Sequence, residues 1–118
     1  MPTNYVLKNV QLSDGSTQDI QIQDDVIIAV APSLTASSLD AAEIIYCDGL
    51  VALPGFVDLH THLREPGFEQ SETVLTGTQS AALGGFTAVH AMANTMPVAD
   101  TAGVVEQVAS LGKEAGYA

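Results

Sequence analysis

The chain has 118 residues, of which 47% are apolar, 14% charged and 5% aromatic. That length and apolar content suit one modest domain with a buried core. Fourteen Asp and Glu residues stand against three Lys and Arg, which gives a formal net charge of −11. A surface this negative repels nucleic-acid phosphates and anionic lipid headgroups, so neither nucleic acid nor a membrane is expected as a partner.

The sequence predicts a cytoplasmic protein. Its apolar runs all fall short of the roughly 20 residues that a membrane-spanning helix needs. The first nine residues, MPTNYVLKN, lack the basic start and apolar block of a secretory signal. The single cysteine, Cys47, cannot form an internal disulfide and is expected to be a small buried apolar side chain. These features agree with a reducing compartment and leave homo-oligomerisation open.

Residues 1–53 are expected to be rich in β-structure. Polar and apolar residues alternate on both sides of Asp24-Asp25, which predicts a hairpin within residues 4–30. A polar loop is expected at residues 32–38, and a further short strand at residues 44–46.

The pattern changes in residues 54–118. Four elements are expected in chain order: a buried strand at 56–60, a helix that Ser71 caps and Gly84-Gly85 ends, a buried strand at 86–92, and a helix that opens at Asp100 or Thr101. This alternation predicts parallel strands joined by helical crossovers. An α/β barrel needs about 250 residues, so we expect the N-terminal piece of a larger protein.

The segment His60-Thr61-His62 ends the first strand expected in this second part. Side chains at positions i and i+2 of a strand point to the same face, so both imidazoles can converge on one point. Histidine nitrogen binds zinc and related ions, and the C-terminal ends of the strands form the catalytic face of an α/β barrel. Because a bare His-x-His motif is short, two ordinary polar loop residues are the alternative interpretation.

Arg64 and Asn94 are the candidate substrate-binding residues. Arg64 lies two residues after His62, so an extended backbone would place it near the metal. A guanidinium matches a carboxylate in a bidentate way, although an exposed ion pair with Glu65 or Glu69 is the alternative. Asn94 follows the second strand, and its amide can donate to and accept from a substrate, although asparagine is also an ordinary turn residue.

Two further side chains are expected to support these candidates. His90, late in the second strand, is interpreted as a packed histidine or as one that contacts a metal ligand. Asp58, two residues before His60, can orient that ligand or accept hydrogen bonds from nearby backbone groups.

Two longer motifs carry a resemblance to a known family. Residues 54–67, PGFVDLHTHLREPG, resemble the opening metal motif of the amidohydrolase superfamily, and the LREPG continuation resembles its dihydroorotase branch. Residues 92–97, MANTMP, resemble that family's second substrate-binding segment, although the family often has proline at Ala93. The resemblance implies an α/β fold: the start of a TIM-type (β/α)8 barrel in residues 54–118, preceded by part of a small β-sandwich in residues 1–53.

The resemblance also implies a site and a reaction. His60 and His62 would bind zinc in a centre of one or two ions, while Arg64 and Asn94 would hold the α-carboxylate of the substrate. The family reversibly cyclises N-carbamoyl-L-aspartate to L-dihydroorotate, so a small anionic molecule is the expected partner. The bridging ligand, the later histidines and the catalytic aspartate of the family would lie beyond Ala118, which makes the remainder of the polypeptide a partner of this chain.

The sequence departs from the family in the loop after the metal motif, where Glu69-Gln70-Ser71 replaces a common aromatic–lysine pair. Two other functions stay open. Allantoinases and hydantoinase-like cyclic amidases share the His-x-His motif, but Arg64 favours a substrate with a carboxylate. A catalytically silent homologue would act as a structural partner of another enzyme, but such proteins are expected to lose ligands, and both histidines are present.

Overall fold

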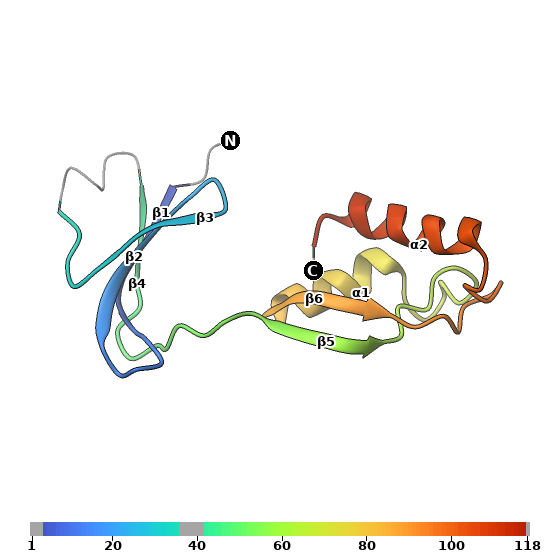
Figure 1. Cartoon of the computed structure of the whole chain (residues 1–118), viewed down its shortest axis with the longest axis horizontal. Helices are drawn as coiled ribbons and strands as arrows, with labels where there is room; N and C mark the ends of the chain where they lie inside the picture. Colours follow the sequence, from blue (N-terminus) through green and yellow to red (C-terminus); the bar gives the residue numbers. More distant parts are fainter. Residues whose placement is uncertain (1–3, 36–41, 118) are drawn as a thin grey trace. The chain divides into compact units, whose positions relative to one another are not determined.

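The structure, a computed structural model, describes residues 4–35 and 42–117. The chain divides into two compact units, Met1–Pro54 and Gly55–Ala118, which are described separately (Figure 1). Of the loop expected at residues 32–38, the part from residue 36 onward lies outside the described residues. Neither helix in the described part of the chain is long and apolar enough to cross a membrane.

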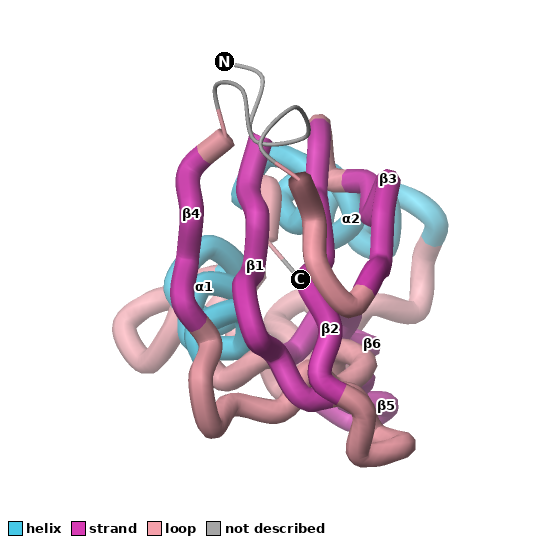
Figure 2. The backbone as a smooth tube through the Cα atoms, turned by 90° about the vertical axis from the view of Figure 1, so that its left-hand side faces the viewer, coloured by secondary structure: helices cyan, strands magenta, loops and turns pink. Residues whose placement is uncertain are grey.

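The first unit contains a four-stranded sheet. Its strands are β1 (Asn4–Gln11), β2 (Thr17–Gln23), β3 (Val26–Ala31) and β4 (Glu43–Tyr46), in the order β3-β2-β1-β4. Strands β1, β2 and β3 pair antiparallel, whereas β4 runs parallel to β1. Figure 2 shows the four strands side by side in this sheet order, with β4 and β3 at its edges. The predicted hairpin and the predicted strand at residues 44–46 are therefore confirmed.

The residue types at the hairpin turn and in the core explain this sheet. Asp24 (φ 49°) and Asp25 (φ 67°) both take the left-handed conformation. Tight hairpins favour this conformation at both central residues, and aspartate adopts it more readily than most side chains.

Val10, Ile20 and Cys47 form the core of the unit, with 3%, 6% and 6% of their surface exposed. The expectation that Cys47 is a small buried apolar residue is thus confirmed.

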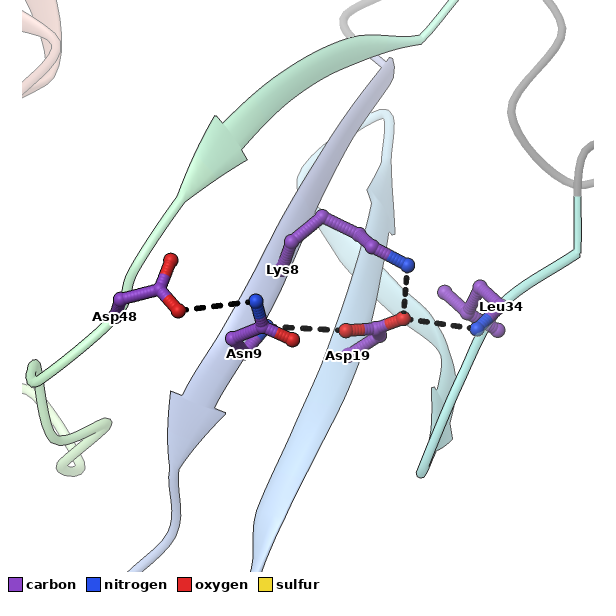
Figure 3. Close-up of polar contacts among 5 residues, drawn as sticks. All are labelled: Lys8, Asn9, Asp19, Leu34 and Asp48. Atoms are coloured by element: carbon purple, nitrogen blue, oxygen red, sulfur yellow. Dashed lines mark hydrogen bonds and ion pairs between the residues drawn. The ribbon is translucent and has the colours of Figure 1, made fainter.

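A buried carboxylate ties three segments of this unit together. Asp19 is 1% exposed and accepts hydrogen bonds from the Lys8 ammonium, the Asn9 N–H at 3.0 Å and the Leu34 N–H at 2.9 Å (Figure 3). Burial alone would raise the pKa of the Asp19 carboxyl, but these donors outweigh burial and lower that pKa below its ordinary 3.8. The carboxylate therefore stabilises the irregular pairing of β1 with β2 and the exit of the chain from β3.

We expect Asp19→Asn to lower the free energy of unfolding of the full-length protein by about 2–4 kcal/mol at pH 7, because charge-assisted bonds to a buried carboxylate are lost. Since the folded pKa is depressed, the stabilisation is present above pH 3.8 and is lost as the pH falls through the folded pKa. Urea unfolding at pH 7 and pH 3 measures both effects. A variant as stable as wild type at pH 7 would contradict the role assigned to Asp19.

The second unit is an α/β arrangement. It contains β5 (Phe56–Thr61), α1 (Val74–Leu83), β6 (Phe86–Ala91) and α2 (Ala102–Ala115). Strands β5 and β6 are parallel, α1 packs against β6, and α2 packs against α1, so both helices lie on one side of the strand pair (Figure 1). The predicted strand–helix–strand–helix order and the parallel pairing are confirmed.

The predicted cap of the first helix is wrong by two residues. Thr73, not Ser71, caps α1: its side chain accepts from the Thr76 N–H at 3.1 Å, and the Thr76 hydroxyl accepts from the Thr73 N–H at 3.0 Å. The Glu65 carboxylate adds a bond from the Val74 N–H at 2.7 Å. These contacts satisfy the free N–H groups of the first turn, so the helix begins after Thr73. The predicted end at Gly84-Gly85 and the predicted start of α2 at Thr101 are confirmed.

The strands of this unit are not buried as predicted. Leu59 in β5 is 69% exposed, and β6 is only partly covered. In the described residues, β5 has one neighbouring strand, and α1 packs against β6. An apolar run such as that of β5 is typical of a strand with both faces covered. The described residues nevertheless leave much of β5 exposed.

Candidate metal centre and substrate cavity

The two histidines lie together at the C-terminal end of β5. His60 is inside the strand and His62 follows directly after it, with ring centroids 5.1 Å apart and planes at 72°. Leu63 anchors this end of the strand because its side chain, 6% exposed, packs against Gly77 of α1. The strand and the helix thus hold both imidazoles on one side of the backbone.

Asn94 reaches His62 from the end of the neighbouring strand. Its Oδ1 lies 2.8 Å from Nδ1 of His62, which is a hydrogen-bond distance. The Met92 N–H donates to the Thr61 carbonyl at 2.9 Å and keeps the ends of β5 and β6 side by side. Asn94 is therefore more than a turn residue, because its side chain contacts a candidate metal ligand.

Asp58 forms a hydrogen bond with the histidine pair, whereas His90 does not. Asp58 Oδ1 accepts from the His60 N–H at 2.9 Å, so it stabilises the backbone of a candidate ligand, one of the two roles considered for it. The expectation that His90 is packed is wrong, because it is exposed on β6. Its face of that strand is not covered by the described residues. The other role considered for it, contact with a metal ligand, is not seen either, since no hydrogen bond in the described residues joins His90 to His60 or His62.

Arg64 lines a hollow with Asn94. This hollow, about 420 Å³ in volume, is bounded by Arg64, Phe68, Ser71 and Asn94. Arg64 has a positive φ of 63°, so the extended backbone assumed from its spacing does not continue past the strand end. The left-handed turn, rather than strand alternation, directs the chain at Arg64 toward the loop that encloses the hollow.

The guanidinium of Arg64 forms no ion pair within the described residues, where the one ion pair joins Lys8 and Asp19. The two acidic neighbours of Arg64 accept hydrogen bonds from backbone N–H groups instead. Glu65 accepts from the first turn of α1, and Glu69 accepts from the Gly67 N–H at 2.8 Å, a bond that lowers the pKa of the Glu69 carboxyl. The surface ion pair considered as an alternative role for Arg64 is therefore not formed.

The loops that follow β5 and β6 contact each other closely. The Met96 N–H donates to the Pro66 carbonyl at 2.9 Å. Gly67 has φ +101°, and a Cβ built on it would lie 2.3 Å from the Met96 carbonyl oxygen, so only glycine fits there. Thr95 is 7% exposed, and its hydroxyl donates to the Pro97 carbonyl at 2.8 Å. These contacts fix the backbone on either side of Asn94.

The donor chemistry of this end of the unit fits half of a zinc site. Two imidazoles side by side supply nitrogen ligands of the kind that zinc prefers, and catalytic zinc sites use three or more protein ligands. No group of three or more His, Cys, Asp or Glu side chains in residues 4–35 and 42–117 is placed to hold a metal ion. A complete centre therefore needs ligands from outside the described residues.

Sequence reasoning missed three residues at this site. Phe68 and Ser71 line the hollow, and Glu65 binds the start of α1. Their positions just after Arg64 were a usable signal for Phe68 and Ser71, because a loop that follows a strand end surrounds whatever binds there.

Comparison with solved structures identifies the class of fold. The solved structure of the L-hydantoinase (dihydropyrimidinase) from Arthrobacter aurescens superposes with a TM-score of 0.77 and 26% sequence identity. It covers 95% of this chain, which in turn covers 25% of that protein. The α/β fold is thus that of a piece of a hydantoinase-like protein.

Sequence comparison gives the family. The Dihydro-orotase-like family matches residues 49–116, so the chain belongs to this family. The dihydroorotase of Leifsonia xyli is 60% identical over 97% of this chain, and that of Streptomyces coelicolor is 58% identical over 95%. The dihydroorotase of Mycobacterium tuberculosis is 50% identical over 87%. The chain spans about a quarter of the length of these relatives, 24–26%.

Proposed function

We propose that the full-length protein is a metal-dependent dihydroorotase, which reversibly cyclises N-carbamoyl-L-aspartate to L-dihydroorotate in pyrimidine biosynthesis. The observation that carries this proposal is the gathering of His60, His62, Arg64 and Asn94 where β5 and β6 end, in a chain up to 60% identical to dihydroorotases. In this proposal residues 54–118 are the first two βα units of an amidohydrolase barrel. Residues 1–53 are part of a β-sandwich, and the protein acts in the cytoplasm on a small molecule.

His60 and His62 would hold zinc in a centre of one or two ions. Bound zinc polarises carbonyl oxygens and lowers the pKa of water, which is the chemistry that opening a cyclic amide needs. Asp58 fixes the backbone of His60, and Asn94 contacts His62. The general base is expected outside this chain.

Arg64 and Asn94 would bind the α-carboxylate of the substrate. Both line the same hollow, and the guanidinium of Arg64 forms no ion pair in the described residues that would have to break first. The planar fork of a guanidinium donates two parallel hydrogen bonds to a carboxylate, and the Asn94 amide can donate a further one. The hollow thus favours an anionic substrate.

We expect Arg64→Lys in the full-length protein to raise the KM for dihydroorotate by about 10–100-fold, because charge is kept but a bond worth about 1.5–3 kcal/mol to a charged group is lost. Steady-state kinetics in the ring-opening direction measure the effect. Unchanged KM and kcat would contradict the assignment of Arg64 to the substrate carboxylate.

The isolated 118-residue chain is expected to lack dihydroorotase activity and to bind zinc weakly, because it supplies two candidate histidine ligands, His60 and His62, where catalytic zinc uses at least three protein ligands. Zinc titration and an activity assay of the purified piece test this expectation. Turnover by the piece alone would show that the catalytic groups are all within it.

A hydantoinase-like activity is the second candidate, favoured by the structural likeness to the Arthrobacter L-hydantoinase. A panel of dihydroorotate, hydantoins and allantoin, assayed with the full-length protein, separates the candidates. Preference for dihydroorotate supports the proposal, preference for an uncharged ring supports the second candidate, and no turnover of any member supports a silent structural homologue.

A further inference from the structure

The contact between His62 and Asn94 defines which nitrogen of His62 carries a proton. A neutral imidazole has one N–H and one lone pair. Asn94 places its carbonyl oxygen, an acceptor, 2.8 Å from Nδ1 of His62. Nδ1 must then be the protonated nitrogen, and the lone pair is left on Nε2.

We propose that Asn94 is a positioning residue for the metal ligand as well as a group that binds substrate. Its Oδ1 holds His62 in the form that offers Nε2 to the metal, and its Nδ2 stays free to donate into the hollow lined by Arg64. One amide therefore connects the metal centre to the substrate carboxylate. This inference rests on the proposed function, because it takes His62 to be a zinc ligand.

The opposite orientation of the amide would not support metal binding. With Nδ2 turned toward His62, Nδ1 would have to accept, and the proton would sit on Nε2, where no lone pair would remain for a metal. The turned amide would also present Oδ1, an acceptor, to an anionic substrate. Only the orientation found satisfies both the metal ligand and the carboxylate.

The backbone around Asn94 keeps its amide in reach of His62. The Met92 N–H donates to the carbonyl of Thr61 at the end of β5, and the Met96 N–H donates to the carbonyl of Pro66 in the loop that follows β5, so hydrogen bonds flank Asn94 on both sides. The Thr95 hydroxyl donates to the Pro97 carbonyl within the loop that follows β6. Asn94 thus acts on His62 from a fixed backbone position.

Two substitutions at this position separate the two roles. Asn94→Ala removes both the acceptor and the donor, so zinc affinity of the full-length protein is expected to fall by about 10–100-fold, the usual effect of losing a partner of a metal-bound histidine, and the KM is expected to rise. Asn94→Asp keeps an oxygen acceptor for Nδ1 but loses the donor and adds a negative charge. It is expected to keep zinc affinity at or above the wild-type value while the KM rises.

Zinc affinity, measured by competition with a chelator, and KM for dihydroorotate, measured with zinc in excess, are the two readouts. Ser71→Ala is the matched control for zinc affinity, because Ser71 lines the same hollow without a hydrogen bond to either histidine. Wild-type zinc affinity in Asn94→Ala, or a loss of affinity in Asn94→Asp, would overturn the inference alone. A wild-type protein that binds no zinc would overturn the proposed function and the inference together.

Discussion

Replacing His60 or His62 by alanine in the full-length protein is expected to remove bound zinc and to lower kcat by at least about 10³-fold. The loss follows because a bound metal contributes several kcal/mol of transition-state charge stabilisation, and about 4 kcal/mol corresponds to that factor. Metal analysis of the purified variants and steady-state kinetics measure the two effects together. Both variants must lose zinc if both imidazoles bind it.

His90→Ala is the control for these variants. His90 lies in the neighbouring strand β6, is exposed, and forms no hydrogen bond with either member of the histidine pair. It is expected to keep both zinc and activity. If it lost either, the effects of the other two substitutions could come from general damage to the strand pair rather than from loss of a ligand. Full zinc content with near-normal rates in His60→Ala or His62→Ala would contradict the assignment of the ligands.

Gly67→Ala is expected to lower the free energy of unfolding by about 2–5 kcal/mol, or to displace the loop that carries Asn94 and so raise the KM. The new Cβ would lie 2.3 Å from the Met96 carbonyl oxygen and 2.4 Å from its Cβ, at a φ of +101°. Backbone strain and overpacking of this kind are each worth about 1–3 kcal/mol. Urea unfolding and KM measured on the same preparation show which of the two responses occurs.

Gly112→Ala is the matched control for this change. Gly112 lies inside α2, and a Cβ built there has open space around it, with no atom within 4 Å. Alanine is favoured over glycine in a helix by about 1 kcal/mol, so this variant is expected to be more stable than wild type. If Gly67→Ala were as stable and active as Gly112→Ala, the close approach of the two loops would not matter to the site.

Local patterns predicted the elements of this chain well. The alternation of polar and apolar residues around Asp24-Asp25 predicted the hairpin, and the apolar runs on either side of α1 predicted the two parallel strands. The His-x-His spacing at the end of a strand predicted that two imidazoles would lie together, and their rings are 5.1 Å apart. Each of these predictions depends on residues close in the sequence.

Contacts between distant residues account for what the sequence did not reveal. Ser71 is as good a helix cap as Thr73, and the choice depends on Thr76 and on the Glu65 carboxylate. Nothing near Asp19 in the sequence marks it as a buried acceptor for donors from positions 8, 9 and 34. The Asn94–His62 contact likewise joins residues 32 positions apart.

The loop contacts around Gly67 also affect which groups would lose conformational entropy when a ligand binds in the hollow. Asn94 is already held by His62, and the Met96 N–H is already paired with Pro66, so a ligand that enters the hollow has little backbone to order. Immobilising a side chain on binding costs about 0.5–1.5 kcal/mol of conformational entropy. If Arg64 binds the substrate carboxylate as proposed, that loss would fall mainly on Arg64, which is exposed and whose guanidinium forms no ion pair in the described residues.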